Sequence, residues 1–402
     1  MLAGFTAAAQ KQTAKWKVGT DIGYNDNIFK GPKSFYDKKA EQYLDMDTVL
    51  LKDMFVENKS SLELTSEKFK KYKFALGFDA WKRNYFQNPL VNSSDVSFKL
   101  SGERFLTKKW GISGRMNTTY SNKLGITILG DAIVRSMEYW YNEGAAGWFY
   151  RWDKRKRLDL EIGAFNKNFF SDTTTSPLHH TMSTFKAIYT FEPKKKRVWQ
   201  FSGSMSERKY SNYWASDSMG VEDSLNGNRH FLYFNAGLSY NRRYTKKLSL
   251  IPELKVSHRK DLFKDFFTNT AIGGGLKARY FMKKFYFSTS VNYRTVYYNV
   301  KIAPTYNDEP QLLLYQFLKW KMKAKMKIGK QLEVEALASF NHRGSNGELH
   351  SWITRRPYNV WQYNLGLRYK ILNKKVKDGS LFEIKPKRRT KGKRLRSGNP
   401  TI

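Results

Sequence analysis

The most regular pattern along this chain is an alternation of apolar and polar residues with a period of two. It is clearest in residues 318–330, LKWKMKAKMKIGK, where every second residue from Lys319 to Lys327 is lysine. On a helix, residues two apart are separated by about 200°, so these lysines would surround the whole cylinder. A β-strand instead places them on one face and Leu318, Trp320 and their successors on the other. The segment is therefore predicted to be a strand with one basic face and one apolar face.

The same alternation recurs along most of the chain, and it predicts about 16 strands. Many of them are longer than the ~5–6 residues that are usual in soluble sheets. They are also long enough to cross a bilayer at a tilt, which takes ~9–11 residues. The predicted strands lie near residues 15–29, 54–66, 72–86, 94–106, 110–122, 138–152, 157–169, 181–192, 197–210, 231–244, 248–260, 267–282, 285–299, 313–328, 331–342 and 359–372.

The connections between the predicted strands are of two kinds. Pairs of basic residues such as Lys108-Lys109, Lys246-Lys247 and Lys283-Lys284 mark short turns. The other connections are long and polar, at residues 30–53, 123–137, 171–180, 211–230, 300–312 and 343–358. Short turns at one end and long loops at the other are typical of an outer-membrane barrel. We therefore predict an all-β transmembrane antiparallel barrel of about 16 strands, within a range of 14–18, with both termini on the periplasmic side.

Other architectures fit the pattern less well. A propeller or solenoid would show a more faithful repeat, and a sandwich would have strands of ordinary length. The mean hydropathy of −0.66 excludes a helical membrane protein, and no run of apolar residues is long enough for a transmembrane helix. Aromatic residues make up 16% of the chain and cysteine is absent. The aromatic content argues against disorder, and an envelope protein without disulfides agrees with the lack of cysteine.

The formal net charge of +37 raises the question of a nucleic-acid partner. The basic residues follow the rhythm of strands and turns rather than forming one patch, so we expect no nucleic acid and instead a basic barrel interior. Charges inside a barrel set which ions it favours. The alternation places the following basic residues in the lumen: Lys319, Lys321, Lys323, Lys325, Lys327, Lys277, Arg279, Arg294, Arg368 and Lys370.

Two glutamates are expected to neutralise part of this charge. If the turn after Lys327 places Ile328 opposite Leu332, then Lys327 faces Glu333 and Lys325 faces Glu335 across the strand pair. Lys319, Lys321 and Lys323 would remain unpaired. Their role stays open between a generic solvated wall and a patch that determines selectivity.

Two stretches resemble known outer-membrane sequences. The last predicted strand, residues 364–371, is similar to the barrel-assembly signal of outer-membrane proteins through Asn364, Gly366, Tyr369 and Ile371, although 31 residues follow it. The first strand reads Gly-Tyr-Asn-Asp-Asn-Ile-Phe over residues 23–29. It resembles the opening of a putative β-barrel porin family often linked to exopolysaccharide systems. These resemblances imply insertion by the barrel-assembly machinery and a place in the bacterial outer membrane, among its lipids and lipopolysaccharide.

The sequence does not favour an enzyme. The six histidines are scattered and lack acidic residues at zinc-ligand spacing, and no Gly-x-Ser-x-Gly or phosphate loop occurs. We expect no metal, no cofactor and no catalytic residues.

The two ends of the chain differ from the middle. Residues 1–14 are interpreted as a signal-peptide remnant and a short N-terminal segment, because Leu2-Ala3-Gly4-Phe5 followed by small residues is similar to a cleavage region. Residues 15–372 would form the barrel. Residues 373–402 would form a basic disordered tail in the periplasm.

These observations lead to two functional hypotheses for the Gram-negative envelope. The first is a porin-like channel with a basic lumen, anion-selective in its transport, that passes anionic solutes or a polymer such as a polysaccharide. The alternative is a non-conducting structural or assembly barrel that serves a secretion or surface-polysaccharide system.

Overall fold

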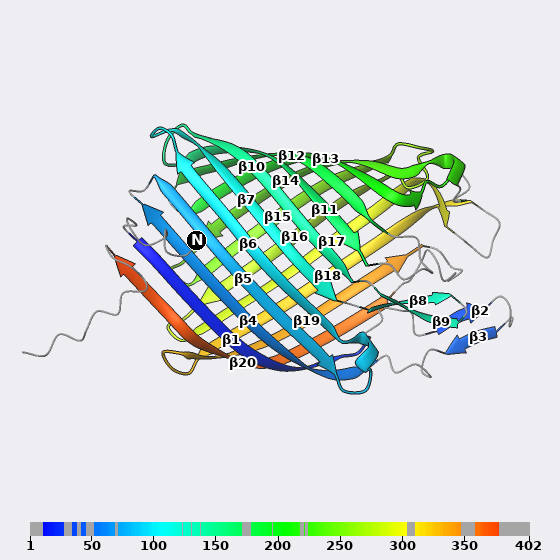
Figure 1. The fold of residues 1–402 in the computed structure, drawn as a ribbon, viewed down its shortest axis with the longest axis horizontal. Helices are drawn as coiled ribbons and strands as arrows, with labels where there is room; N and C mark the ends of the chain where they lie inside the picture. The colour runs from blue at the N-terminus through cyan, green and yellow to red at the C-terminus, as the bar shows by residue number, and fades with distance from the viewer. Residues whose placement is uncertain are drawn as a thin grey trace, which may run out of the picture.

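A computed structural model describes residues 11–27, 34–37, 42–45, 52–68, 71–122, 124–129, 131–136, 138–170, 178–194, 196–217, 221, 224–303, 310–346 and 358–377. In this part of the chain, 16 strands form one closed antiparallel barrel, seen from the side in Figure 1. Each strand pairs with the next barrel strand along the chain, and the first pairs with the last. The prediction of an all-β barrel of about 16 strands is confirmed.

The barrel strands are β1 (Lys11–Asn25), β4 (Asp53–Lys68), β5 (Tyr72–Tyr85), β6 (Ser93–Phe105), β7 (Trp110–Asn122), β10 (Tyr139–Arg151), β11 (Lys156–Phe169), β12 (His180–Lys194), β13 (Arg197–Trp214), β14 (Asn228–Arg243), β15 (Leu248–Asp261), β16 (Asn269–Phe281), β17 (Phe285–Ala303), β18 (Gln311–Lys327), β19 (Leu332–Ser345) and β20 (Tyr358–Lys377). Two 3₁₀ turns, η3 (Pro89–Val91) and η4 (Ser224–Asn226), lie in connections between strands. No helix in the described residues is long and apolar enough to span a membrane.

Several strand ends differ from the predictions by up to five residues, and β1 ends at Asn25 rather than at residue 29. β1 begins at Lys11 and β20 ends at Lys377, so the boundaries of the barrel at residues 15 and 372 were too narrow. β1 pairs with β20 along its whole length, from Lys11 opposite Lys377 to Asn25 opposite Gln362. The rest of both predicted terminal segments, residues 1–10 and 378–402, lies outside the described residues.

Two of the predicted polar loops contain hairpins. β2 (Ser34–Asp37) pairs with β3 (Gln42–Asp45), and β8 (Leu124–Leu129) pairs with β9 (Asp131–Ser136). In Figure 1 both hairpins lie beyond the right-hand end of the barrel, away from the end where β1 begins and β20 finishes. That right-hand end is the long-loop end, and the opposite end carries the short turns.

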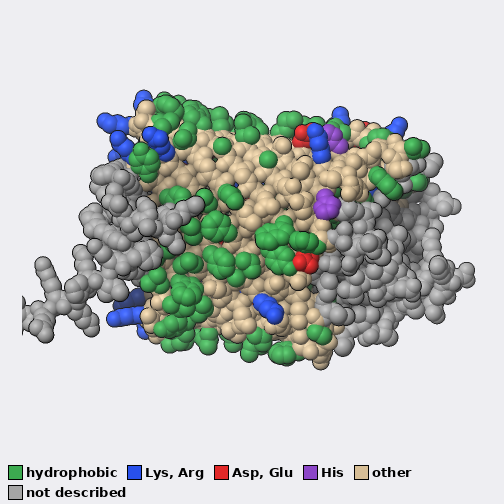
Figure 2. Space-filling view, viewed as in Figure 1, with side chains coloured by type: hydrophobic (Ala, Val, Ile, Leu, Met, Phe, Trp, Pro, Cys, Tyr) green, Lys and Arg blue, Asp and Glu red, His purple; other side chains and the backbone are tan. Residues whose placement is uncertain are grey.

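The two faces of each barrel strand meet different surroundings. On β20, the side chains of Tyr363, Leu365 and Leu367 are 47–62% exposed, whereas Asn364 and Arg368 are each 9% exposed. The apolar face therefore points out of the barrel, as lipid contact requires, and the polar face points into it. Figure 2 shows the result for one side: hydrophobic side chains spread over the middle of the barrel wall, and most of the visible charged side chains lie toward its ends.

Candidate functional site

The register between β18 and β19 places the lysine row beside two glutamates. The backbone N–H of Ile328 donates to the carbonyl of Leu332 at 3.1 Å and closes the turn. Lys325 then lies opposite Glu335, and Lys327 lies opposite Glu333. This is the register expected from the sequence, because a short turn between long strands leaves little freedom in how they align.

The ion pairs do not join only the residues that lie directly opposite each other on β18 and β19. The carboxylate of Glu335 contacts the ammonium groups of both Lys323, at 2.6 Å, and Lys325, at 2.9 Å. The prediction that Lys323 stays unpaired was therefore wrong. A long side chain reaches diagonal neighbours as well as the residue directly opposite.

Glu333 is bound from the other side of its strand. Lys370 of β20 contacts it at 2.7 Å and Lys17 of β1 at 4.0 Å, and no ion pair joins it to Lys327 within the described residues. The expected Lys327–Glu333 contact is therefore replaced by contacts from strands distant in sequence. Lys319, Lys321 and Lys327 have no carboxylate partner in the described part of the chain.

A chain of alternating charges crosses the seam where the last strand meets the first. The guanidinium of Arg368 on β20 donates to both carboxylate oxygens of Asp21 on β1, at 2.5 and 2.6 Å. Asp21 also accepts from Lys59 of β4 at 2.7 Å, and Lys59 contacts Glu57. Glu57 in turn receives two hydrogen bonds from Arg83 of β5, at 2.9 and 2.7 Å. Arg368 faces inward and was expected to line open water. Its side chain is only 11% exposed and forms an ion pair with Asp21.

The residues matched to the assembly signal have separate roles in this seam. A Cβ on Gly366 would lie 1.6 Å from Oδ1 of Asp21, so only glycine leaves room for the carboxylate. Asn364 is buried and accepts a hydrogen bond from Gln362 at 2.9 Å. Tyr369 and Ile371 are 45% and 41% exposed on the outer face.

The remaining predicted cations gather on one wall of the lumen. β16, β17 and β18 contain no aspartate or glutamate at all. Their inward positions carry a set that we call the basic wall: Lys277, Arg279, Arg294, Lys319, Lys321, Lys323, Lys325 and Lys327. The structure thus brings eight of the ten predicted lumenal basic residues onto three neighbouring strands, and places Arg368 and Lys370 in the seam network.

The wall across the lumen has a different composition. Around the ring of 16 strands, β17 is eight steps from β7, and β16 and β18 face β6 and β10 in the same way. There, Arg115 of β7 binds Glu161 at 2.9 Å and also contacts Glu143 of β10. Glu103 of β6 binds Arg157 at 2.8 Å. Cations and acids balance on this wall, so the lumen is positive mainly on the opposite side.

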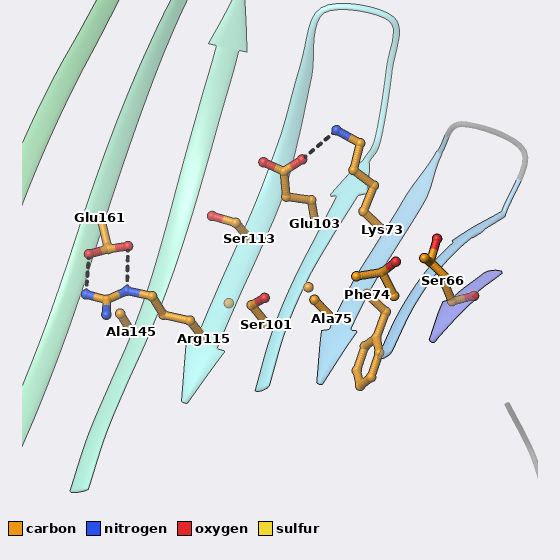
Figure 3. Close-up of a pocket in the computed structure, with 14 residues that line it drawn as sticks. Ser66, Lys73, Phe74, Ala75, Ser101, Glu103, Ser113, Arg115, Ala145 and Glu161 are labelled. Atoms are coloured by element: carbon orange, nitrogen blue, oxygen red, sulfur yellow. Dashed lines mark hydrogen bonds and ion pairs between the residues drawn. The ribbon is translucent and has the colours of Figure 1, made fainter. Parts of the chain in front are cut away.

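The balanced wall also contains a hollow of about 470 Å³. Figure 3 shows two ion pairs, Lys73 with Glu103 and Arg115 with Glu161, with Ser113 between them and the small side chains of Ser101, Ala75 and Ala145 alongside. Small side chains leave the wall recessed there, and paired charges keep it near neutral. The described residues hold no group of three or more His, Asp or Glu side chains placed to bind a metal.

A closed barrel with an apolar outer surface and a charged, hydrogen-bonded interior defines a porin-like protein of the bacterial outer membrane. No family model matches the chain, and no curated protein matches its sequence. Among solved structures, the outer membrane protein OprD from Pseudomonas aeruginosa is similar with a TM-score of 0.45 and 7% identity, over 92% of this chain and 96% of OprD.

Two further solved structures give similar values. Acinetobacter baumannii OccAB1 has a TM-score of 0.44 and 8% identity, over 90% of this chain and 97% of OccAB1. A bacterial polysaccharide outer membrane secretin has a TM-score of 0.41 and 7% identity, over 88% of this chain and 98% of the secretin.

Proposed function

We propose that this barrel is a passive channel that favours small anionic solutes and catalyses no reaction. The observation that carries the proposal is the basic wall, since three adjacent strands present cations to the lumen and contain no acidic residue. Lys319 and Lys321 are exposed and without a carboxylate partner in the described residues. Charges that line a water-filled passage raise the local concentration of the opposite ion.

The distribution of ion pairs supports the same function. On the seam and on the wall around β7, most lumenal cations form ion pairs with carboxylates. Such pairs add little to the net electrostatic potential of the lumen. On the basic wall only Lys323 and Lys325 are matched, both by Glu335. An anion would therefore pass along β16–β18 rather than along the centre of the lumen.

The test is ion selectivity in planar bilayers, measured as the reversal potential across a potassium chloride gradient. In the double variant Lys319→Glu/Lys321→Glu we expect the permeability ratio to move toward potassium by about twofold or more. The matched control is Lys283→Glu/Lys284→Glu, which makes the same charge change in an exposed short turn outside the lumen. An equal shift in both variants, or none in either, would contradict the proposal.

One observation favours a second candidate function. On β18 the inward residues Leu313 and Tyr315 are only 1% and 4% exposed, so the long-loop end of the interior is closely packed on that side. A barrel that never conducts would instead be a structural or assembly element for a secretion or surface-polysaccharide system. Absence of any conductance steps from purified protein would support this alternative. In either case we propose that its partners are outer-membrane lipids, lipopolysaccharide and the barrel-assembly machinery.

A further inference from the structure

Three cations lie in one row across β12, β13 and β14 at the short-turn end of the barrel, which is on the left in Figure 1. Lys194 is the register partner of Arg197, and Arg197 is the register partner of Arg242. Neighbouring strands lie about 4.8 Å apart, so the row is about 10 Å long. We call these three residues the outer basic cluster.

The outer basic cluster points out of the barrel. Alternate residues of a strand share a face, so Arg197 lies on the side of Phe201 and Met205, which are 46% and 47% exposed. Arg242 shares the side of Phe234, which is 42% exposed. The cluster therefore lies on the lipid-facing side of the wall, apart from the lumen and from the basic wall.

The cluster has no carboxylate in an ion pair with it in the described part of the chain. The nearby acids are committed elsewhere. Asp153 accepts hydrogen bonds from the backbone N–H groups of Arg155 and Lys156, at 2.6 and 3.0 Å. Glu192 accepts one from the backbone N–H of Lys196 at 3.2 Å and lines a hollow on the lumenal side.

This arrangement of charge favours a bound anion. Like charges directly opposite each other on a strand pair destabilise it, and Arg197 faces a cation on both of its neighbouring strands. An anion placed between the side chains of Arg197 and Arg242 would turn this repulsion into attraction.

Aromatic side chains continue the outward face from the cluster toward the middle of the barrel. Trp199 and Tyr240 are register partners, each two residues from an arginine of the cluster, and their rings stack with centres 4.3 Å apart. Phe201 follows two residues further along β13. Along the barrel axis the outer wall thus passes from cations, through an indole and a phenol, to an apolar ring. A membrane passes from headgroup to acyl chain in the same order.

We propose that the outer basic cluster binds the phosphate of an anionic glycerophospholipid, of which phosphatidylglycerol is the simplest example. Short turns of outer-membrane barrels face the periplasm, and the leaflet on that side consists of phospholipids. A guanidinium donates parallel hydrogen bonds to two phosphate oxygens. The rings of Trp199 and Tyr240 lie where the glycerol and the first acyl carbons follow the phosphate. A zwitterionic headgroup fits less well, because the cluster offers no carboxylate to its ammonium group.

Native mass spectrometry of the purified full chain in a neutral detergent, titrated with one lipid at a time, tests the site. We expect the first phosphatidylglycerol to bind about fivefold more tightly than the first phosphatidylcholine. In Arg242→Gln the affinity for phosphatidylglycerol should fall by about fivefold, whereas that for phosphatidylcholine should change by less than about twofold. Arg197→Gln, which removes the other member of the opposed pair, should give the same result.

The matched control is Arg104→Gln, on the outward face of β6 at the same end of the barrel. Arg104 lies 5.4 Å from the ring centre of Tyr72, much as Arg242 lies 4.2 Å from that of Tyr244. Its register partners are Tyr72 and Ile112 rather than cations. The control should therefore keep the affinity for phosphatidylglycerol to within about twofold.

Competitors distinguish a lipid from other anions. Inorganic phosphate has the charge without acyl chains, and hexaglutamate represents an acidic segment of a protein. Neither should displace phosphatidylglycerol when present at the concentration of the lipid. Displacement by phosphate would assign the cluster to a soluble phosphate, and displacement by hexaglutamate would assign it to an acidic protein. Either result, equal affinity for the two lipids, unchanged binding in Arg242→Gln and Arg197→Gln, or an equal loss in Arg104→Gln would overturn the proposal.

The lipid site rests on the proposed partnership with outer-membrane lipids and makes it specific, but it does not rest on the channel. Lipid binding is measured without conductance, and ion selectivity is measured with variants inside the lumen. A failure of the channel proposal would therefore leave the lipid result unaffected, and a failure of the lipid proposal would leave the selectivity result unaffected.

Discussion

Arg368 and Asp21 hold the two ends of the barrel chain together through two parallel hydrogen bonds of 2.5 and 2.6 Å. One residue lies on the last strand and the other on the first, 347 positions apart. Their side chains are 11% and 3% exposed. Every other pair of neighbouring barrel strands is joined by a turn or loop, whereas β1 and β20 meet only through backbone pairing and side-chain contacts such as this one.

Asp21→Ala should therefore destabilise the barrel strongly. It removes the closest counter-charge of buried Arg368, whose other carboxylate neighbour, Glu335, lies farther away at 3.8 Å. The expected loss in the free energy of unfolding is about 3–5 kcal/mol. Urea unfolding of the purified protein, followed by tryptophan fluorescence, measures this loss. Glu63→Ala is the matched control, because Lys15–Glu63 also joins β1 to its neighbour, at 2.9 Å, but its side chains are 40% and 53% exposed. The control should lose less than about 1 kcal/mol. Comparable losses in the two variants would show that the Arg368–Asp21 pair contributes no more to the free energy of unfolding than an exposed ion pair does.

Gly366→Ala should disturb the same seam for a steric reason. The added Cβ would lie 1.6 Å from the carboxylate of Asp21 and 2.8 Å from the carbonyl of Thr20. Overpacking of this kind costs about 1–3 kcal/mol. Gly144→Ala, where nothing lies within 4 Å of the added atom, should be nearly neutral in the same unfolding measurement.

A double variant tests whether the loss in Gly366→Ala comes from the clash with the Asp21 carboxylate. When Gly366→Ala is combined with Asp21→Ala, the clash with the carboxylate disappears, so the further loss should be smaller than in the wild-type background. Full additivity would indicate that Gly366 matters for a reason unrelated to the Asp21 carboxylate, such as the close approach to the carbonyl of Thr20.

The sequence predicted the strands well because the period of two is a local property. Alternation between lipid and lumen sets which face each side chain occupies, and it placed Lys319 and Lys321 correctly on the face opposite Trp320. The register of β18 with β19 was also predictable, since the turn at Ile328 and Leu332 ties the strands together. These features depend on residues that are close in the chain.

The contacts that could not be predicted from the sequence join strands that are distant in the chain. No turn connects β1 to β20, so nothing local fixed Asp21 beside Arg368. The same closure brought Lys370 to Glu333.

Glu335→Gln should increase the preference of the channel for anions. Glu335 alone matches Lys323 and Lys325, at 2.6 and 2.9 Å, so the change releases charge on the basic wall with little change in shape. We expect a shift of the chloride-to-potassium permeability ratio toward chloride, of less than about twofold because the lumen is wet. Glu207→Gln, which makes the same charge change on the outer face of β13, is the control. A shift toward potassium, or an equal shift in the control, would contradict the basic-wall proposal.

Cysteine labelling tests the orientation of β18 directly, because the chain contains no cysteine of its own. Lys321→Cys and Met322→Cys place a thiol on adjacent residues of β18. Residues that alternate along a strand face opposite sides of the wall, so the first thiol should face water and the second lipid. A water-soluble anionic methanethiosulfonate reagent should modify Lys321→Cys at least about tenfold faster, because thiolate forms in water and not in hydrocarbon. Lys284→Cys, in an exposed turn, controls for access of the reagent. Equal rates at the two positions, or faster labelling of Met322→Cys, would show that the lysine row does not line the lumen.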